Sequence, residues 1–344
     1  MKILYLECNM GAAGDMLMGA LADLLPDRQA FADRLNNLGI PGVHVDLQKA
    51  VKCGIVGTHA EVTVNAAEEE SLELPSQTSA TVSGSAEEHH HHVHHHPDAA
   101  LSQGDAQTHS HTHIDHENGD HEHSEDPENS AHIHAHAESS EESAHVHSHS
   151  GHTHHSHEHH GMTEIAHLIE HLEIPEQVKE DVKNIYSIIA EAEASVHGRP
   201  VSEIHFHEVG TADALADITG CALLMREIGA GKIVTSPVNV GYGQVRCAHG
   251  ILPVPAPATA RILEGIPCYA GPIEGELCTP TGAAILKYYT DEYRRLPQMI
   301  IRQTGYGMGK KDFPAANCVR AVLGESLRLP CFPSPYSKPS NCIL

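Results

Sequence analysis

The side chains best suited to metal and proton chemistry are concentrated between His205 and Asp217. His205 and His207 lie two positions apart, so in an extended segment both imidazoles point to one face. Asp213 and Asp217 lie four positions apart, which places both carboxylates on one face of a following helix. Two imidazoles at a strand end that face two carboxylates can coordinate a divalent cation, and Glu208 beside them is the candidate catalytic carboxylate.

A structural interpretation of the same stretch stays open. The helix macrodipole alone favours an aspartate in a first helical turn, and a histidine pair on a strand is often only hydrogen-bonded. The density of the whole group favours a functional site, whereas either aspartate taken alone fits both interpretations.

A glycine-rich turn, Gly11-Ala-Ala-Gly14-Asp15, follows an apolar strand at residues 2–6 and opens a helix with apolar periodicity. Free backbone N–H groups at such a turn can bind phosphate, or let a metal-bound aspartate approach. Gly14 is therefore a candidate cofactor-binding residue and Asp15 a candidate catalytic one. The Gly-Lys-Ser/Thr ending of a Walker motif is missing, and a tight turn with Asp15 near a helix N-cap is the alternative.

Two later turns add candidates. His249 precedes Gly250 in what we expect to be a rigid proline-rich loop at residues 248–259, where it can act as a third metal ligand or a general acid, or be an inert turn residue. Thr279 before Pro280 predicts a helix start, with Thr279 at the N-cap and the proline at the first helical position. The hydroxyls of Thr279 and Thr281 and the free N–H groups could hold a phosphate, and plain capping is the alternative.

Residues 66–160 carry 19 of the 46 acidic residues and 25 of the 33 histidines of the chain, with no lysine or arginine. So few apolar residues cannot offset the entropy of ordering, which predicts a disordered insertion. Neighbouring imidazoles on a flexible segment can bind nickel, copper or zinc, and an uncharged spacer is the alternative. The expected nickel storage ligands are His89, His90, His91, His92, His94, His95, His96, His152, His154, His155 and His157.

The remainder of the chain is only mildly acidic, because its 27 acidic residues face 21 basic ones, whereas the whole chain has a net charge of −25. No basic patch is available for a nucleic acid. The opening apolar run is too short for a signal peptide, and no stretch reaches the roughly 18 apolar residues that a membrane span needs, so we expect a cytoplasmic protein without a membrane partner. Nine cysteines without any C-x-x-C pair indicate reduced thiols.

Hydrophobic periodicity predicts an α+β fold of small mixed sheets and amphipathic helices, interrupted by the His-rich insertion. The opening part reads strand, helix, helix, strand, strand, and amphipathic helices follow the insertion. Near the end we expect a strand at residues 299–303, a glycine turn at 305–309 and a last strand at 317–323. The predicted parts are 1–65 (N-terminal α+β), 66–161 (insertion), 162–324 (α+β with the candidate metal site) and 325–344 (unstructured tail).

With these residues in place, the sequence resembles the nickel insertion proteins of the LarC family. The matching elements follow one another in the same order from Met1 to about Gly324. They are Gly14-Asp15-Met16, the His-rich insertion, His205-Phe-His207-Glu208-Val-Gly210 with Asp213 and Asp217, His249-Gly250 with Pro253 to Thr259, and Thr279-Pro-Thr281-Gly282.

The resemblance implies a CTP-dependent nickel cyclometallase of the lyase class. Such an enzyme inserts Ni²⁺ into pyridinium-3,5-bisthiocarboxylic acid mononucleotide and forms the nickel-pincer nucleotide cofactor that lactate racemase receives. The resemblance also implies Mn²⁺ or Mg²⁺ with the CTP. Family members continue into a C-terminal domain that carries nucleotide binding. Since residues 328–344 are rich in proline and lack periodicity, we expect turnover to need that domain, supplied as a separate chain or by a frame change near Gly324.

Two other functions compete with insertion. The first is a nickel storage protein or chaperone that lacks the insertion chemistry. The second is a metal-dependent hydrolase that opens with His-x-His, but only His249 lies downstream of His207 to complete such a site, and the eight-fold strand–helix repeat is missing.

Overall fold

The computed structural model describes residues 1–65, 67–68, 161–204, 206, 212–247 and 249–327. The chain divides into two compact units, one formed by Met1–Ser76 with Ser156–Leu344 and the other by Gln77–His155. The second unit lies outside the described residues, as do most of the predicted insertion and the tail from residue 328. The first unit joins the parts of the chain that flank the insertion.

The opening part follows the predicted order of strand, helix, helix, strand and strand. Its elements are β1 (Lys2–Glu7), α1 (Gly14–Ala22), α2 (Arg28–Asn36), β2 (Val43–Lys52) and β3 (Ile55–Val64). Asp27 is the N-cap of α2 and accepts a hydrogen bond from the Ala30 N–H. The antiparallel pair β2–β3 turns at Cys53 and Gly54, whose φ angles of 48° and 80° lie in the left-handed region that tight hairpin turns require.

Eight of the described strands form one mixed sheet in the order β12-β5-β1-β14-β13-β3-β2, with β4 paired to β3. The remaining members are β4 (Ala67–Glu68), β5 (Lys232–Thr235), β12 (Glu292–Tyr293), β13 (Met299–Met308) and β14 (Cys318–Ser326). Strand β1 lies inside the sheet, parallel to β5 on one side and antiparallel to β14 on the other. The first and last parts of the described chain therefore build one sheet, which confirms the α+β class.

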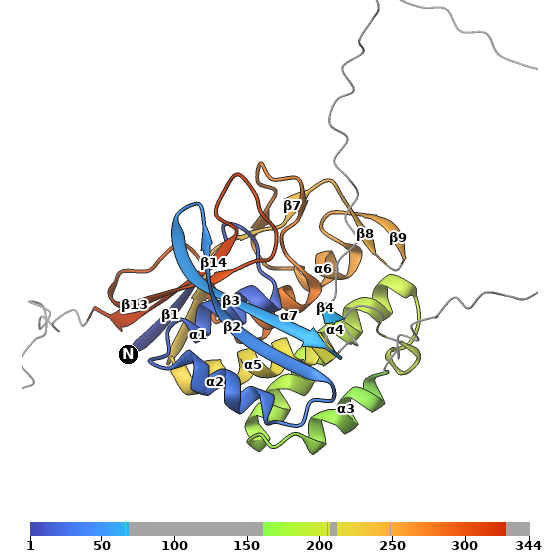
Figure 1. Ribbon diagram of the computed structural model, residues 1–344. Coiled ribbons are helices and arrows are strands. Elements are labelled where there is room, and N and C mark those ends of the chain that lie inside the picture. Colours follow the sequence, from blue (N-terminus) through green and yellow to red (C-terminus); the bar gives the residue numbers. More distant parts are fainter. Residues whose placement is uncertain (66, 69–160, 205, 207–211, 248, 328–344) are drawn as a thin grey trace, which may run out of the picture. The chain divides into compact units, whose positions relative to one another are not determined.

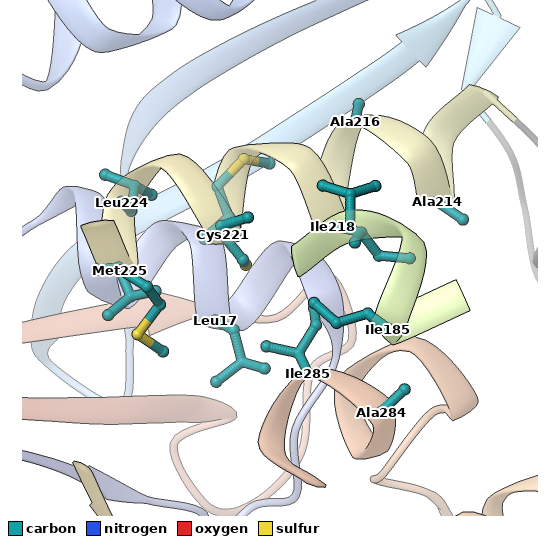
Figure 2. Close-up of a cluster of buried hydrophobic side chains, with 14 of the residues drawn as sticks. Leu17, Ile185, Ala214, Ala216, Ile218, Cys221, Leu224, Met225, Ala284 and Ile285 are labelled. Carbon is teal, nitrogen blue, oxygen red and sulfur yellow. The ribbon is translucent and has the colours of Figure 1, made fainter. Parts of the chain in front are cut away.

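Helices cover one face of this sheet and supply most of the core. They are α1, α2, α3 (Met162–His171), α4 (Glu176–His197), the short 3-10 turn Val201–Glu203, α5 (Ala212–Ile228), α6 (Pro257–Ile262) and α7 (Pro280–Tyr289). Helices α1, α2 and α5 pack on the strands, as Figure 1 shows. Figure 2 shows α5 side chains lying among Leu17 of α1, Ile185 of α4 and Ile285 of α7, all of them buried.

Helix α4 forms where apolar residues recur every three or four positions, and Val178, Val182, Ile185 and Ile189 are fully buried as this spacing requires. It ends at Gly198, whose φ of 62° gives the left-handed cap that glycine adopts without strain.

Two sequence expectations, a loop at residues 248–259 and a turn at residues 305–309, were wrong. Residues Gly250–Pro253, expected in a loop, form strand β9, which pairs with β8 (Gln244–Cys247) as a hairpin. Two further small pairs are β6 (Val238–Asn239) with β10 (Cys268–Tyr269), and β7 (Gly241–Tyr242) with β11 (Gly275–Glu276).

The glycines at residues 305–307 continue strand β13 rather than form a turn. A Cβ atom at Gly305 would lie 2.4 Å from the Ala20 carbonyl oxygen, and one at Gly307 would lie 1.8 Å from that of Met16. These glycines therefore let the backbone of α1 rest directly on the strand, which is a tertiary reason for glycine that local sequence does not reveal.

None of the helices in the described part of the chain is long and apolar enough to cross a membrane.

Candidate functional site

Asp217, one of the predicted metal ligands, points from α5 at the beginning of α1. Its side chain is only 6% exposed. A Cβ atom placed on Gly14 would lie 2.2 Å from Asp217 Oδ2, so only a glycine leaves room for the carboxylate. The backbone N–H of Asp15 hydrogen-bonds to Asp217, and one turn later the Cys221 thiol lies 3.7 Å from the Gly14 carbonyl oxygen. We call the contact of Gly14, Asp15, Asp213 and Asp217 the α1–α5 junction.

The local sequence explains why α1 needs this carboxylate. Its N-cap is Ala13, whose side chain makes no capping hydrogen bond. The first N–H groups of a helix lack partners within the helix and carry a partial positive charge, so an anion or hydrogen-bond acceptor stabilises them. Asp217 supplies that acceptor from another helix about 200 positions along the chain. The structural and the metal-binding interpretations of Asp217 are thus compatible, because one carboxylate oxygen can accept the helix N–H while the other binds a metal ion.

The second oxygen, Asp217 Oδ1, is buried and has no hydrogen-bond partner among the described residues. Burial raises the pKa of Asp217 well above its usual range, and the nearby Asp213 and Asp15 carboxylates raise it further, against the Asp15 N–H, which lowers it. A positive charge placed at this oxygen would offset these unfavourable terms, but Asp15, Asp213 and Asp217 alone are not arranged as a metal site, so a cation here would need further ligands.

Tyr186 of α4 adds a second unpartnered polar atom. Its side chain is fully buried, and its hydroxyl has no hydrogen-bond partner within the described part of the chain. Burial raises the pKa of this hydroxyl, and the charges of Asp213 and Asp217 raise it further. Its ring meets Phe206 edge-on, with the centroids 6.0 Å apart. We did not predict Tyr186, although a tyrosine next to Ile185 on a buried helix face signals a hydroxyl that needs a partner.

Asp15 faces basic groups. Its Oδ1 accepts a 2.7 Å hydrogen bond from the Met16 N–H. Burial raises the pKa of Asp15, whereas that hydrogen bond, His59 and Lys310 lower it. His59 Nδ1 lies 2.8 Å from the Met308 carbonyl oxygen, which can only accept, so Nδ1 carries the hydrogen and Nε2 is the free acceptor. We did not predict His59 or Lys310, because a position on β3 or shortly after β13 does not show which helix end a side chain faces.

The two turns predicted to hold phosphate pack on each other. Ala12 bridges to Cys278, and the Thr279 N–H donates a 3.0 Å hydrogen bond to the Ala12 carbonyl oxygen. The Thr279 hydroxyl oxygen caps α7 by accepting from the Gly282 N–H at 3.2 Å, as predicted. These contacts give Gly14 and Thr279 structural roles, and phosphate binding by Gly14, Thr279 and Thr281 stays a prediction.

His249 is exposed and lies beside His197, with the ring centroids 4.9 Å apart. His197 Nε2 in turn lies 3.4 Å from Glu193 Oε2. The structure therefore brings His249 to the end of α4, and its catalytic role stays a prediction.

The remaining candidates cannot be placed. His205, His207 and Glu208 lie outside the described residues, as do all the predicted storage histidines between His89 and His157. Within the described ranges, no group of three or more histidine, cysteine, aspartate or glutamate side chains is arranged to hold a metal ion. The structure shows no disulfide between cysteines of the described residues.

The fold and the α1–α5 junction define an α+β protein that gathers carboxylates at a helix start, in a chain that also carries 33 histidines. This combination is typical of proteins that handle metal ions. The chain belongs to the nickel insertion protein family, whose pattern matches residues 4–338.

Several curated relatives carry the name pyridinium-3,5-bisthiocarboxylic acid mononucleotide nickel insertion protein. The one from Desulfitobacterium hafniense (strain DSM 10664 / DCB-2) is 44% identical over 94% of this chain and 59% of its own length. That from Geobacillus kaustophilus (strain HTA426) is 33% identical over 96% of this chain and 61% of its own length. This chain thus spans about three fifths of the length of the relatives it matches. No solved structure matches it.

Proposed function

We propose that this chain takes part in cytoplasmic, CTP-dependent nickel insertion into pyridinium-3,5-bisthiocarboxylic acid mononucleotide, as a cyclometallase of the lyase class. Nickel is the substrate ion, CTP with Mn²⁺ or Mg²⁺ is the co-substrate, and lactate racemase receives the product. Support comes from membership in the nickel insertion family and from the names of its relatives. In this proposal, the chain works together with a protein segment that corresponds to the part of those relatives that it does not span.

The single observation that carries the site assignment is the buried Oδ1 of Asp217, which has no hydrogen-bond partner among the described residues. We assign Asp217 and Asp213 as carboxylate ligands of the reacting nickel ion, together with His205 and His207, which precede α5 in the sequence. An ion that must be transferred to an organic ligand needs a site with few protein ligands and open positions, as catalytic metal sites have. Two imidazoles and one or two carboxylates meet that requirement.

Proton handling is assigned to the groups around this site. Formation of a nickel–carbon bond at a ring carbon that carries hydrogen releases a proton, so a base must accept it. Glu208 is the candidate base and His249 the candidate general acid, and Asp15 lies beside Asp217 with His59 and Lys310 near its own carboxylate. Tyr186, whose hydroxyl lies in the field of Asp213 and Asp217, is a further group that can hydrogen-bond to a ligand there.

The decisive experiment mixes the chain with Ni²⁺, CTP, Mn²⁺ and the pincer precursor, and follows product absorbance with and without the remaining portion of a curated relative. We expect Asp217→Asn to abolish product formation while it keeps the fold, because the amide oxygen still accepts the Asp15 N–H. The matched control is Asp181→Asn on α4, whose carboxylate accepts hydrogen bonds from Tyr288 and Tyr289 away from the junction. A fully active Asp217→Asn variant would remove Asp217 from the site.

Nickel storage is the second candidate function, favoured by the 25 histidines at residues 66–160. The same assay separates the two functions. Nickel uptake without product, even with the relative's remaining portion present, supports storage, whereas product formation supports insertion.

A further inference from the structure

A second group of metal-ligand side chains lies on α3, outside the α1–α5 junction. The sequence His167-Leu-Ile-Glu-His171 places two histidines four positions apart. In a helix this spacing puts both side chains on one face, one turn apart. The structure shows this arrangement, with the two ring centroids 4.3 Å apart and the ring planes inclined by 37°.

The remainder of α3 holds this face in place. Ile165 and Ile169 are buried in the core, and His167 and His171 are exposed on the opposite side. At the helix start, Glu164 accepts a 3.0 Å hydrogen bond from the Gly161 N–H. The pair is therefore presented to solvent by a helix that the core fixes, so little ordering is needed when an ion binds.

His171 already has the tautomer of a metal ligand. Its Nδ1 lies 2.8 Å from the His167 carbonyl oxygen, which can only accept, so Nδ1 carries the hydrogen. The lone pair of Nε2 is then free for an ion. Metal-binding histidines characteristically donate the other ring N–H to a carbonyl or carboxylate in this way, because that bond fixes the ring orientation.

Glu170 completes an H-x-x-E-H pattern, which on a helix is also a metallopeptidase signature. Here the Glu170 carboxylate pairs with Lys183, and the Lys179 ammonium donates to the Glu170 carbonyl oxygen at 2.9 Å. The Lys183 hydrogen bond lowers the pKa of Glu170. A carboxylate held by a lysine makes a poor general base, and the described residues offer no third protein ligand, so peptidase chemistry does not fit.

We propose that His167 and His171 form a two-histidine site for a borderline divalent cation of the Ni²⁺, Cu²⁺ or Zn²⁺ class, with water in the other coordination positions. Neutral imidazole suits all three ions. Bound to both rings, the ion links successive turns of α3 and stabilises the second half of that helix. This site is independent of nickel insertion, since it uses neither the junction nor a nucleotide.

The test needs a local readout on the whole chain, because the many other histidines also take up metal. Hydrogen exchange of peptides from α3 is measured by mass spectrometry in buffered free Ni²⁺. If opening of the helix breaks the site, bound Ni²⁺ slows exchange by a factor. This factor is one plus the ratio of the free Ni²⁺ concentration to the dissociation constant of the site. We expect about tenfold slower exchange when free Ni²⁺ is ten times the half-saturating concentration.

Variants decide the assignment. His167→Ala and His171→Ala should each remove the slowing, whereas Glu170→Gln and the control His44→Ala, an exposed single histidine on β2, should keep it. As a second measurement, Ni²⁺ should protect His167 and His171, but not His44, from carbethoxylation at the same free ion concentration. Wild-type α3 peptides that exchange equally fast with Ni²⁺, or slowing that persists in the His167→Ala/His171→Ala double variant, would overturn the proposal.

Discussion

The α1–α5 junction and the histidine pair of α3 both gather metal-ligand side chains, but they do so in opposite surroundings. At the junction, Asp217 is 6% exposed, with one oxygen on a helix start and the other without a hydrogen-bond partner in the part of the chain that the structure describes. On α3, His167 and His171 are exposed, and the His171 ring is hydrogen-bonded to the helix backbone. The junction is thus part of the core, whereas the histidine pair lies on the surface of a helix that packs against the core.

This difference predicts how each region responds to change. A buried carboxylate that contacts another helix is coupled to folding, so its substitution alters stability as well as any metal chemistry. An exposed pair on a stable helix can gain or lose an ion without a change in the core.

The largest effect is expected from Gly14→Ala. The new Cβ would lie 2.2 Å from Asp217 Oδ2 and 2.7 Å from its Cβ, so the carboxylate or the helix must move. Overpacking of this kind costs roughly 1–3 kcal/mol, which we expect as a loss in the free energy of unfolding measured with denaturant. Alanine is otherwise the better helix former, so the loss must come from this contact.

A double-mutant cycle isolates that contact. Asp217→Ala alone should cost about 1–3 kcal/mol, because it leaves the N–H groups at the start of α1 without an acceptor. The Gly14→Ala/Asp217→Ala double variant should be less destabilised than the sum of the single variants by about 1 kcal/mol or more, since the clash then has no partner. Additive losses would show that the two residues do not interact as described.

The next effect is a pH dependence of the metal-free protein in the presence of EDTA. Burial and neighbouring carboxylates raise the pKa of Asp217 in the folded state above the unfolded value of about 3.9. Below that value both states are protonated. As pH rises from there, the unfolded state loses its proton first, so stability falls until the folded pKa is passed, by at most about 1.4 kcal/mol per pH unit.

Asp217→Asn cannot lose a proton and keeps an oxygen toward the Asp15 N–H. Its free energy of unfolding minus that of the wild type should therefore increase from pH 4.5 to pH 8. A difference that stays constant over this range would mean that Asp217 titrates alike in both states.

The same contrast shows what sequence could and could not predict. Thr279 was correctly placed at a helix N-cap, because capping depends on a few neighbouring residues. The carboxylates at positions 213 and 217 were correctly placed on one helix. The contact of Asp217 with Gly14 was not predicted, because it joins residues about 200 positions apart. Local patterns identify the helices but not which helix start receives the carboxylate.

The wrong turn at residues 305–309 has a similar origin. Glycine in a sequence indicates a turn when its φ angle is the reason for its presence. At Gly305 and Gly307 the reason is the approach of α1 within 2.4 Å and 1.8 Å of where a Cβ would lie. Tyr186 was missed for a related reason, since its apolar neighbours explain its burial but not the position of its hydroxyl.

The smallest effect is expected on α3 without metal. His167→Ala and His171→Ala remove exposed side chains, and alanine favours the helix, so the free energy of unfolding in EDTA should change by no more than about 0.5 kcal/mol. The same variants should abolish the Ni²⁺-dependent slowing of exchange in α3 peptides. Loss of the Ni²⁺ response without loss of stability would show that the histidine pair binds the ion but does not stabilise the fold. If either variant instead destabilised the protein as much as Asp217→Ala does, the histidine pair would be part of the core packing, and its contrast with the junction would disappear.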